Sequence, residues 1–368
     1  MFVLGVVLIL LTFGFLLLGY PLFLWLLSKT KRRPVKKREI FPFISIIIPS
    51  FNEGNVIDRK IHNIFASEYP RSQYEVIVVD SGSTDYTQQI LEKHCKDESI
   101  ISIRQPKRLG KPHAINAGLA VAKGKIVVLT DADAFLNVES LKKLVRNFAD
   151  ENVGAVVGNL TLDGNDTVNR MNSAFYKIFR QSAREWESEI DSASFFSGEL
   201  LAFRKSLVDN IDENVVSDDQ YILFEIRKKG YRGICEKEAF VFERDVETMR
   251  GQINHKRRTL VGTLQVFSKN RSVLFNPKYG FFGMLIAPAY LLRIVINPFL
   301  LFLVPMFLII YAPYILLLLL VTLVLMAILS RRLLMALLYG LVVQLAVILG
   351  IIDYATRNYT VLWRKKGK

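Results

Sequence analysis

Residues 126–134 read Ile-Val-Val-Leu-Thr-Asp-Ala-Asp-Ala, an apolar run that ends in two carboxylates two positions apart. Alternate side chains of a strand point to the same side, so Asp131 and Asp133 can converge on one point where the strand ends. A hard divalent cation needs one or two such carboxylates when diphosphate oxygens fill its other positions. A solvated turn is the simpler explanation for an isolated Asp-x-Asp pair. The surrounding sequence decides between the two.

Three further apolar runs precede this pair, and helical patterns separate them. Such short alternation of strand and helix predicts an α/β fold with a parallel sheet and helices on both of its faces. Ligands of these sheets bind outside the carboxyl ends of the strands. The runs cover Phe43–Pro49, Tyr74–Asp80 and Ile100–Arg104.

Polar residues also follow the first two of these runs. Each group could be ordinary turn chemistry, but all of them would share one edge of a parallel sheet. The loop with Pro49, Asn52 and Glu53 is placed to face a nucleobase. Asp80 is a hydrogen-bond acceptor for uracil, a similar imide or a ribose. The sequence therefore predicts a nucleotide site at this edge.

Gly110 and Lys111 open a later helix, where backbone N–H groups and one cation are available to phosphate. A plain surface lysine is the alternative for Lys111. In this arrangement Asp133 is the metal ligand, and Asp131 either faces the ribose or shares the metal. A nicotinamide-binding domain would need Gly-x-Gly-x-x-Gly after the first strand, and the sequence lacks that pattern there.

Apolar residues make up 51% of the 368-residue chain and are concentrated toward its two ends. Residues 2–27 carry no charged side chain and exceed the roughly 20 residues that cross a bilayer. Basic residues follow this segment and do not precede it, which favours a retained span over a cleaved signal peptide. By the positive-inside rule the following domain lies in the cytoplasm.

The C-terminal region is again strongly apolar, and we predict three spans near 285–308, 312–329 and 333–353. Two spans remain the alternative, because the positive-inside rule cannot place every basic cluster inside. Arg293 is either a functional intramembrane charge or a residue that reaches the headgroups. The predicted organisation is a membrane helix (1–28), a basic linker (29–42), a cytoplasmic domain (43–270), an interfacial segment (271–284), membrane helices (285–355) and a basic tail (356–368).

The formal charge of +14 sits largely beside the apolar segments. Basic residues in that position are attracted to anionic lipid. This distribution favours a membrane-lipid partner over nucleic acid.

Four ordered motifs resemble family 2 glycosyltransferases with the A-type nucleotide-sugar fold. They are Ile-Ile-Ile-Pro-Ser-Phe-Asn-Glu (46–53), Val-Val-Asp-Ser-Gly-Ser-Thr-Asp (78–85), Gly-Lys-Pro-His-Ala-Ile-Asn-Ala-Gly-Leu (110–119) and Asp-Ala-Asp (131–133). The membrane layout is similar to that of the branch with cellulose and hyaluronan synthases. The resemblance implies a transferase domain with a mainly parallel central sheet, flanked by helices and bracketed by transmembrane helices.

Asp219 matches the general base of this family, as the second carboxylate of Val216-Ser217-Asp218-Asp219-Gln220 ahead of a helix. Capping by Ser217 and the helix dipole are an alternative explanation for the acidic pair. A base suits the chemistry, because an acceptor hydroxyl must lose its proton as it attacks the anomeric carbon. The segment 195–204 is similar to the one that shapes the family's acceptor pocket. It implies acceptor binding for Ser197 and Gly198, and the resemblance of the acidic pair implies the same for Asp218.

Residues 250–262 resemble a degenerate version of the family's Gln-x-x-Arg-Trp motif. The best alignment puts His255 at the Gln, Arg258 at the Arg and Thr259 at the Trp. This implies acceptor contact for His255 and diphosphate contact for Arg257 or Arg258. Thr259 cannot stack on a sugar as Trp does, which weakens the case for polymer extension. A basic stretch resting on lipid headgroups is the alternative.

The sequence thus predicts a membrane-bound, inverting glycosyltransferase of the hexosyltransferase type, assisted by Mn²⁺ or Mg²⁺. It would take a sugar from a UDP- or GDP-linked donor at the cytoplasmic face of the cell membrane. The acceptor would be lipid-linked or a saccharide. A processive polysaccharide synthase that secretes its product is the main alternative. A non-catalytic membrane scaffold is a third hypothesis.

Overall fold

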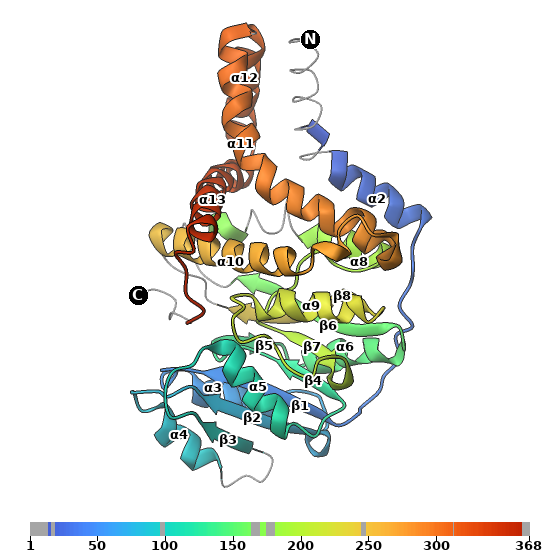
Figure 1. The fold of residues 1–368 in the computed structure, drawn as a ribbon, viewed down its shortest axis with the longest axis vertical. Helices are drawn as coiled ribbons and strands as arrows, with labels where there is room; N and C mark the ends of the chain where they lie inside the picture. The colour runs from blue at the N-terminus through green and yellow to red at the C-terminus, as the bar shows by residue number, and fades with distance from the viewer. Residues whose placement is uncertain are drawn as a thin grey trace.

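The computed structural model describes residues 14–362, apart from 16–18, 96–99, 163–169, 174–180, 244–247 and 312. An α/β domain forms the lower part of the molecule in Figure 1, and the C-terminal helices stand above it. The helix α2 (Tyr20–Thr30) lies near these helices, and the chain then runs down the outside of the domain to the first strand.

A single sheet is the centre of the domain. In the described part of the chain its eight strands are β1 (Ile44–Ser50), β2 (Tyr74–Asp80), β3 (Ile100–Arg104), β4 (Ile126–Leu129), β5 (Ala134–Leu136), β6 (Val153–Leu162), β7 (Leu201–Arg204) and β8 (Arg232–Glu243). They lie in the order β3-β2-β1-β4-β7-β6-β8-β5. The first four of these are parallel, β7 is antiparallel to β4 and β6, and β5 is antiparallel to β8. The predicted α/β fold is confirmed, with a sheet that is parallel in one half and mixed in the other.

Helices cover both faces of the sheet. They are α3 (Ile57–Phe65), α4 (Thr87–His94), α5 (Lys111–Val121), α6 (Ser140–Val145), α8 (Ser182–Ile190), α9 (Asp218–Lys228) and α10 (Met249–Lys269), with short turns η2 (Arg71–Gln73), η3 (Arg146–Ala149) and η5 (Lys205–Leu207). Ile44, Ile46 and Ile48 of β1 join one core, with α3, α4 and α6, whereas Ile47 joins the other, with α5, α9 and α10. The apolar runs form strands because a strand covered on both faces needs apolar side chains on both.

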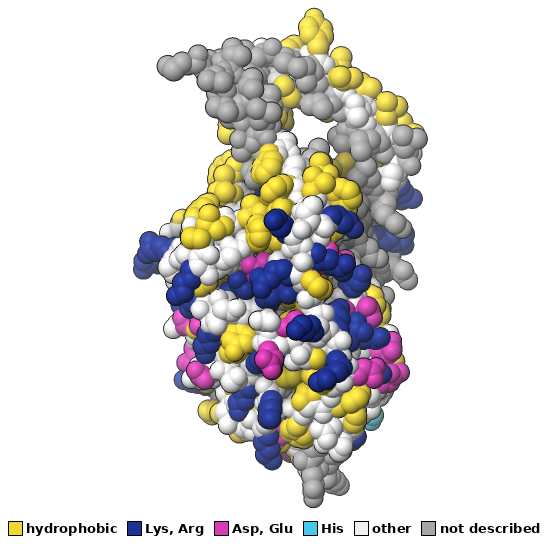
Figure 2. Space-filling view, turned by 90° about the vertical axis from the view of Figure 1, so that its right-hand side faces the viewer, with side chains coloured by type: hydrophobic (Ala, Val, Ile, Leu, Met, Phe, Trp, Pro, Cys, Tyr) yellow, Lys and Arg dark blue, Asp and Glu magenta, His cyan; other side chains and the backbone are white. Residues whose placement is uncertain are grey.

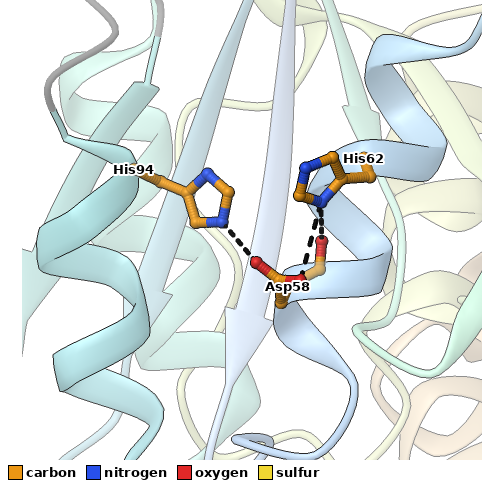
Figure 3. Close-up of side chains that lie close together, drawn as sticks. All are labelled: Asp58, His62 and His94. Atoms are coloured by element: carbon orange, nitrogen blue, oxygen red, sulfur yellow. Dashed lines mark hydrogen bonds and ion pairs between the residues drawn. The ribbon is translucent and has the colours of Figure 1, made fainter.

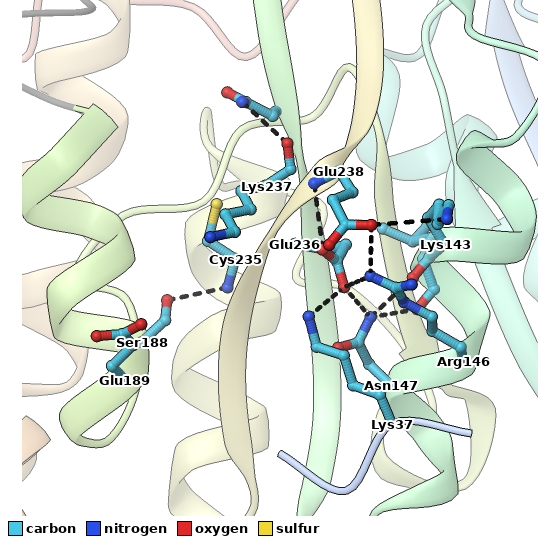
Figure 4. A network of polar contacts seen from close by, with 12 residues as sticks. Lys37, Lys143, Arg146, Asn147, Ser188, Glu189, Cys235, Glu236, Lys237 and Glu238 are labelled. Carbon is cyan, nitrogen blue, oxygen red and sulfur yellow. Dashed lines mark hydrogen bonds and ion pairs between the residues drawn. The ribbon is translucent and has the colours of Figure 1, made fainter. Parts of the chain in front are cut away.

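The extended segment between α2 and β1 is tied to the edge of the domain (Figure 4). Glu236 of β8 is fully buried, and its Oε2 accepts from Lys37 Nζ at 2.7 Å and from Asn147 Nδ2 at 2.9 Å. Arg146 Nη2 lies 3.4 Å from the same oxygen. The charge pattern predicted lipid contact for this linker. Lys37 instead neutralises a buried acid and holds the linker along the domain.

Helix α2 packs on the domain through one face. Tyr20 and Leu24 are buried in a cluster with α8 and with the start of α11 (Ala287–Tyr311). The predicted N-terminal span (1–28) lies largely outside the described residues, but its last turns belong to this contact. The remaining surface of α2 exposes the apolar side chains of Leu22, Phe23, Trp25 and Leu26.

The C-terminal region of the described chain begins with η6 (Arg271–Val273), η7 (Pro277–Tyr279) and η8 (Phe282–Ile286) and continues with α11, α12 (Pro313–Leu329) and α13 (Arg331–Ala355). Two stretches, Phe282–Ile310 and Leu334–Ala355, are long and apolar enough to cross a membrane by length and composition. In Figure 2, hydrophobic side chains gather toward this end of the molecule, and Lys and Arg side chains are frequent below them.

Candidate active site

The carboxyl ends of β1, β2 and β4 meet at one edge of the sheet. The register of β1 and β2 places Ser50 opposite Asp80. Ser81 N donates to Ser50 O at 2.8 Å, and Thr130 N donates to Ile47 O at 3.2 Å. The polar residues that follow these three strands therefore belong to one site, as expected for a parallel sheet.

Asp80 is fully buried at the end of β2. Its Oδ1 accepts from Ser83 N at 3.0 Å, while its Oδ2 makes no hydrogen bond with any described residue. A buried carboxylate oxygen without a donor is costly unless a ligand supplies one. The Oδ2 atom is therefore available to an N–H or O–H group of a bound nucleoside.

The loop after β1 is braced against the loop after β2. Asn52 has a left-handed backbone with φ 56°. Its N donates to Ser83 Oγ at 2.8 Å, and its Oδ1 accepts from Thr84 N at 2.8 Å. Glu53 is buried, and its carbonyl accepts from Val56 N and from Ile57 N, the first residue of α3. These bonds fix the segment from Pro49 to Glu53 beside the end of β2, so Asn52 shapes the wall of the predicted donor site.

The acidic turn after β4 gains a third carboxylate from β8. The pairing of β5 with β8 places Ala134 opposite Glu243. Carboxylate oxygens of Asp131, Asp133 and Glu243 all lie within 4.8 Å of one another. Three hard oxygen ligands fit Mg²⁺ or Mn²⁺ and leave positions for phosphate oxygens.

Sequence reasoning missed Glu243. The sequence feature that could have revealed it is an acid at an inward-facing position of an alternating strand. Ala239, Val241 and Glu243 are buried, while Phe240 and Phe242 are exposed. What the sequence did not show is that β8 pairs with the short strand after the acidic turn.

Lys60 of α3 is fully buried beneath this turn and was also missed. Its Nζ donates to Thr130 Oγ1 at 2.8 Å and to the carbonyl of Ala134. One side chain therefore binds the residues on both sides of the turn. Burial lowers the pKa of Lys60 to about 7, against the opposing effect of the three carboxylates. Its burial could have been inferred from its position three residues after Ile57 and four before Ile64, on the apolar face of the helix.

Lys111 joins the two halves of the site. Its Nζ lies 2.7 Å from Asp131 Oδ1 and 3.7 Å from Asp218 Oδ2. A Cβ at Gly198 would lie 2.9 Å from the same nitrogen, so the glycine leaves room for the ammonium group. Burial opposes the charge, but the neighbouring carboxylates outweigh it and raise the pKa of Lys111. We expected Lys111 and Gly110 to face phosphate; Lys111 instead bridges two acids.

Asp218 and Asp219 open α9 on the far side of this bridge. Asp219 Oδ1 accepts from Ser217 Oγ and, at 2.7 Å, from Gln220 N. The Ser217 hydroxyl thus holds Asp219. The alternative explanation required this hydroxyl to cap the helix, and it does not. Burial, followed by the adjacent charge of Asp218, raises the pKa of Asp219 to about 7. A carboxyl group that titrates near neutral pH suits proton transfer.

The basic stretch of α10 makes contacts that the sequence did not predict. Arg257 forms a two-point ion pair with Asp353 of α13, at 2.8 and 2.7 Å. Arg258 donates to the carbonyls of residues 360–362 and holds the C-terminal segment. Arg257 therefore lies at the contact between α10 and α13, while the charge of Arg258 also acts on Asp218. The diphosphate contact of Arg257 or Arg258 stays a prediction. The acceptor role of His255 stays a prediction.

A second group of metal-ligand side chains lies on the surface of α3 and α4 (Figure 3). His94 Nε2 lies 2.8 Å from Asp58 Oδ1, and His62 Nδ1 lies 2.9 Å from the carbonyl oxygen of Asp58. Asp58 and His62 are exposed, and both rings already have a partner. The group joins the two helices at the solvent face.

Residues 45–212 match the family described as Glycosyl transferase family 2. The chain is 23% identical over 232 residues to the poly-beta-1,6-N-acetyl-D-glucosamine synthase of Staphylococcus aureus (strain MSSA476), over 62% of this chain and 56% of that protein. It is 37% identical over 118 residues to the beta-monoglucosyldiacylglycerol synthase of Nostoc sp. (strain PCC 7120 / SAG 25.82 / UTEX 2576), over 31% of this chain and 25% of that protein. The chain thus spans little more than half the length of the Staphylococcus relative.

Among solved structures, the mannosyltransferase PcManGT from Pyrobaculum calidifontis, in complex with GDP-Man and Mn²⁺, matches with a TM-score of 0.77 at 26% identity. The match covers 95% of this chain and 99% of that one, so it extends beyond the sheet to the C-terminal helices. Together with the family match, this similarity shows that the chain carries a glycosyltransferase family 2 domain with a GT-A-like fold.

Proposed function

We propose that the protein is a membrane-bound, metal-assisted, inverting glycosyltransferase. It moves a sugar from a nucleotide-diphosphate donor to a hydroxyl group of a lipid-linked or saccharide acceptor. The observation that carries the proposal is the position of Lys111 between Asp131 of the acidic turn and Asp218 beside Asp219. One ammonium group thereby brings the donor side and the acceptor side of the site together.

Each part of the site has a role in this reaction. Asp80 accepts a hydrogen bond from the nucleoside through Oδ2. Asp133, Asp131 and Glu243 would hold a divalent cation, which would neutralise charge on the diphosphate. Asp219 takes the proton of the acceptor hydroxyl, and the oxygen bonds to the anomeric carbon as the bond from that carbon to the nucleoside diphosphate breaks. A single displacement of this kind inverts the anomeric centre.

GDP-mannose with Mn²⁺ is the first donor to test, because the mannosyltransferase with the similar fold binds both. UDP-sugars are the second class, since the free oxygen of Asp80 suits the ring N–H of uracil as well as that of guanine. Mg²⁺ is the alternative cation, because the same oxygen ligands suit it.

The surface of the molecule supports attachment to the cell membrane, with the domain on the cytoplasmic side. Large apolar side chains of α2 are exposed, which marks a surface for contact with lipid or protein. The apolar stretches Phe282–Ile310 and Leu334–Ala355 have the length of membrane spans.

A processive polysaccharide synthase is the second candidate function. The name of the Staphylococcus aureus relative favours it, as does the position of the domain between apolar helices. Thr259 on α10 argues against it, because this residue offers no aromatic surface for a growing saccharide.

The test uses the purified full-length protein in lipid nanodiscs, with radiolabelled GDP- and UDP-sugars, Mn²⁺ or Mg²⁺, and a lipid extract as the acceptor. Label in a short lipid product supports single transfer, whereas label in a long polymer supports the synthase. Asp219→Asn is the inactive comparison. Asp212→Asn removes a surface acid paired with Lys269 and is the matched control. If no donor gives turnover or metal-dependent nucleotide binding, the proposed function is refuted.

A further inference from the structure

Helix α3 carries ionisable side chains on two opposite faces. Lys60 lies on the buried face beneath the acidic turn, whereas Asp58 and His62 lie on the exposed face. His94 of α4 reaches this exposed pair, so two of the chain's four histidines meet one carboxylate. The proposed transfer reaction does not use this group.

The three side chains point toward one another between the two helices (Figure 3). Asp58 and His62 are one helical turn apart, so they share one face of α3. The ligand atoms of all three residues lie within 4.8 Å of one another, and the ring centroids of His62 and His94 are 5.5 Å apart. Zinc holds nitrogen and oxygen ligands at about 2.0–2.2 Å, so an ion among these atoms requires only small shifts. The side chains of Asp58 and His62 are exposed and can make them.

The hydrogen bonds of the group leave a lone pair for an ion. His62 Nδ1 lies 2.9 Å from the carbonyl oxygen of Asp58, and because a carbonyl only accepts, Nδ1 carries the proton. The lone pair of His62 is therefore on Nε2. Metal-binding histidines usually make this second hydrogen bond to a carbonyl or carboxylate, which fixes the ring. His94 Nε2 lies 2.8 Å from Asp58 Oδ1, and an ion can take the place of the proton between these two atoms.

The ligand set differs from that of the acidic turn. Two imidazoles and one carboxylate favour Zn²⁺ and similar transition metals, whereas three carboxylates favour Mg²⁺ or Mn²⁺. Three protein ligands also leave one tetrahedral position, which water can fill at the exposed surface. The two groups can therefore select different ions.

We propose that Asp58, His62 and His94 form a zinc site that joins α3 to α4. The ion bridges a pair of side chains on α3 and a single histidine on α4, so coordinate bonds replace a polar contact between the helices. Ile61 of α3 and Leu91 of α4 belong to the same core, which already holds the two helices together.

Joining these helices stabilises the loops that precede them. Before α3, Gly54 N donates to Asp85 Oδ2 at 3.2 Å, and Asp85 Oδ1 accepts from Thr87 N, at the start of α4, at 3.0 Å. The same two loops contain Asn52 and Ser83, which form the wall of the predicted donor site. The zinc site therefore supports this wall through the two helices that follow it.

The test is isothermal titration calorimetry of Zn²⁺ into the full-length protein in detergent, purified without a histidine tag. Excess Mg²⁺ is present to compete for the carboxylates of the acidic turn. We expect the wild type to bind one zinc ion per chain. His62→Ala, His94→Ala and Asp58→Asn should each lower the affinity at least about tenfold, because each removes one ligand.

Two variants serve as matched controls. His113→Ala removes a histidine that pairs with Glu213 on another part of the surface. Cys95→Ser removes the exposed thiol next to His94 in sequence. Both are expected to bind zinc with the affinity of the wild type, and a loss of binding in either would overturn the assignment of the ligands.

Binding that survives His94→Ala would leave the ion on α3 alone or at another site, and would overturn the proposal. Saturation only at millimolar zinc would show adventitious surface binding and would overturn it as well. Hydrogen exchange of α3 and α4, followed by mass spectrometry, should slow with zinc in the wild type and stay unchanged in His94→Ala. Equal exchange with and without zinc in the wild type would refute the joining of the two helices.

Discussion

The two halves of the sheet place their functional residues by different means. In the parallel half, Asp80 is the last residue of β2 and Asp131 lies two residues after β4, so these strands fix their positions. In the mixed half, Glu243 reaches the acidic turn only because β8 pairs with β5. Asp218 reaches Lys111 only because α5 and α9 contribute to the core on the same face of the sheet. The donor side of the site is therefore local in sequence, whereas the acceptor side depends on contacts between distant segments.

Asp219→Asn should remove the function of the acceptor side alone, and we expect it to have the largest effect on the transfer rate. Loss of the base is expected to lower the transfer rate about 10²- to 10⁴-fold. Nucleotide binding with Mn²⁺, measured by calorimetry, should stay at the wild-type value, because Asp80 and the acidic turn are unchanged. An equal loss of nucleotide affinity would show that the two sides do not act separately.

Lys60→Met should weaken the turn on which both halves meet. The change leaves the carbonyl of Ala134 without its Lys60 donor and removes the buried cation near three acids, with an expected loss of about 1–3 kcal/mol in stability. Mn²⁺ should raise the unfolding temperature more in this variant than in the wild type, because the metal supplies the missing charge. Lys142→Met, which removes a surface pair with Glu39, is the control. Identical unfolding curves for Lys60→Met and the wild type would contradict this role.

The pH dependence of the transfer rate should further separate the acceptor side from the donor side. The pKa of Asp219 is raised to about 7, and only the deprotonated carboxylate can accept a proton. The value of kcat/KM is therefore expected to fall about tenfold per pH unit below pH 7 and to level off above it. Initial rates in buffers between pH 5 and 8.5, with nucleotide binding followed in parallel, provide the measurement. A flat rate profile below pH 7 would exclude Asp219 as the base with this pKa.

Arg257→Lys should have the smallest effect on turnover. The side chain pairs with Asp353, so the change weakens the α10–α13 contact by about 0.2–1 kcal/mol and should leave the donor KM within about twofold of the wild type. Steady-state kinetics and thermal unfolding measure both quantities. A tenfold rise in the donor KM would instead support the diphosphate contact of Arg257 that the sequence predicted.

Lys111, Arg257 and Lys60 show where prediction from the sequence stops. Lys111 was predicted to act at the site, but its bridge between Asp131 and Asp218 required the packing of two distant segments. Arg257 or Arg258 was predicted to contact the diphosphate, but the ion pair of Arg257 with Asp353 of α13 could not be read from the sequence. Lys60 was missed because its hydrogen bonds are with the loop after β4, about 70 residues away in sequence.

The sequence by itself determined the four parallel strands, the edge at which they end, and the positions of Asp80, Asp131 and Asp133 there. Apolar runs and turns are local patterns, and in a parallel sheet they leave one edge for a ligand. Tertiary structure alone decided that Glu243 completes the acidic group, that Lys60 supports it and that Lys111 lies between Asp131 and Asp218. Each of these depends on the distance between segments remote in sequence, and that distance is set by packing.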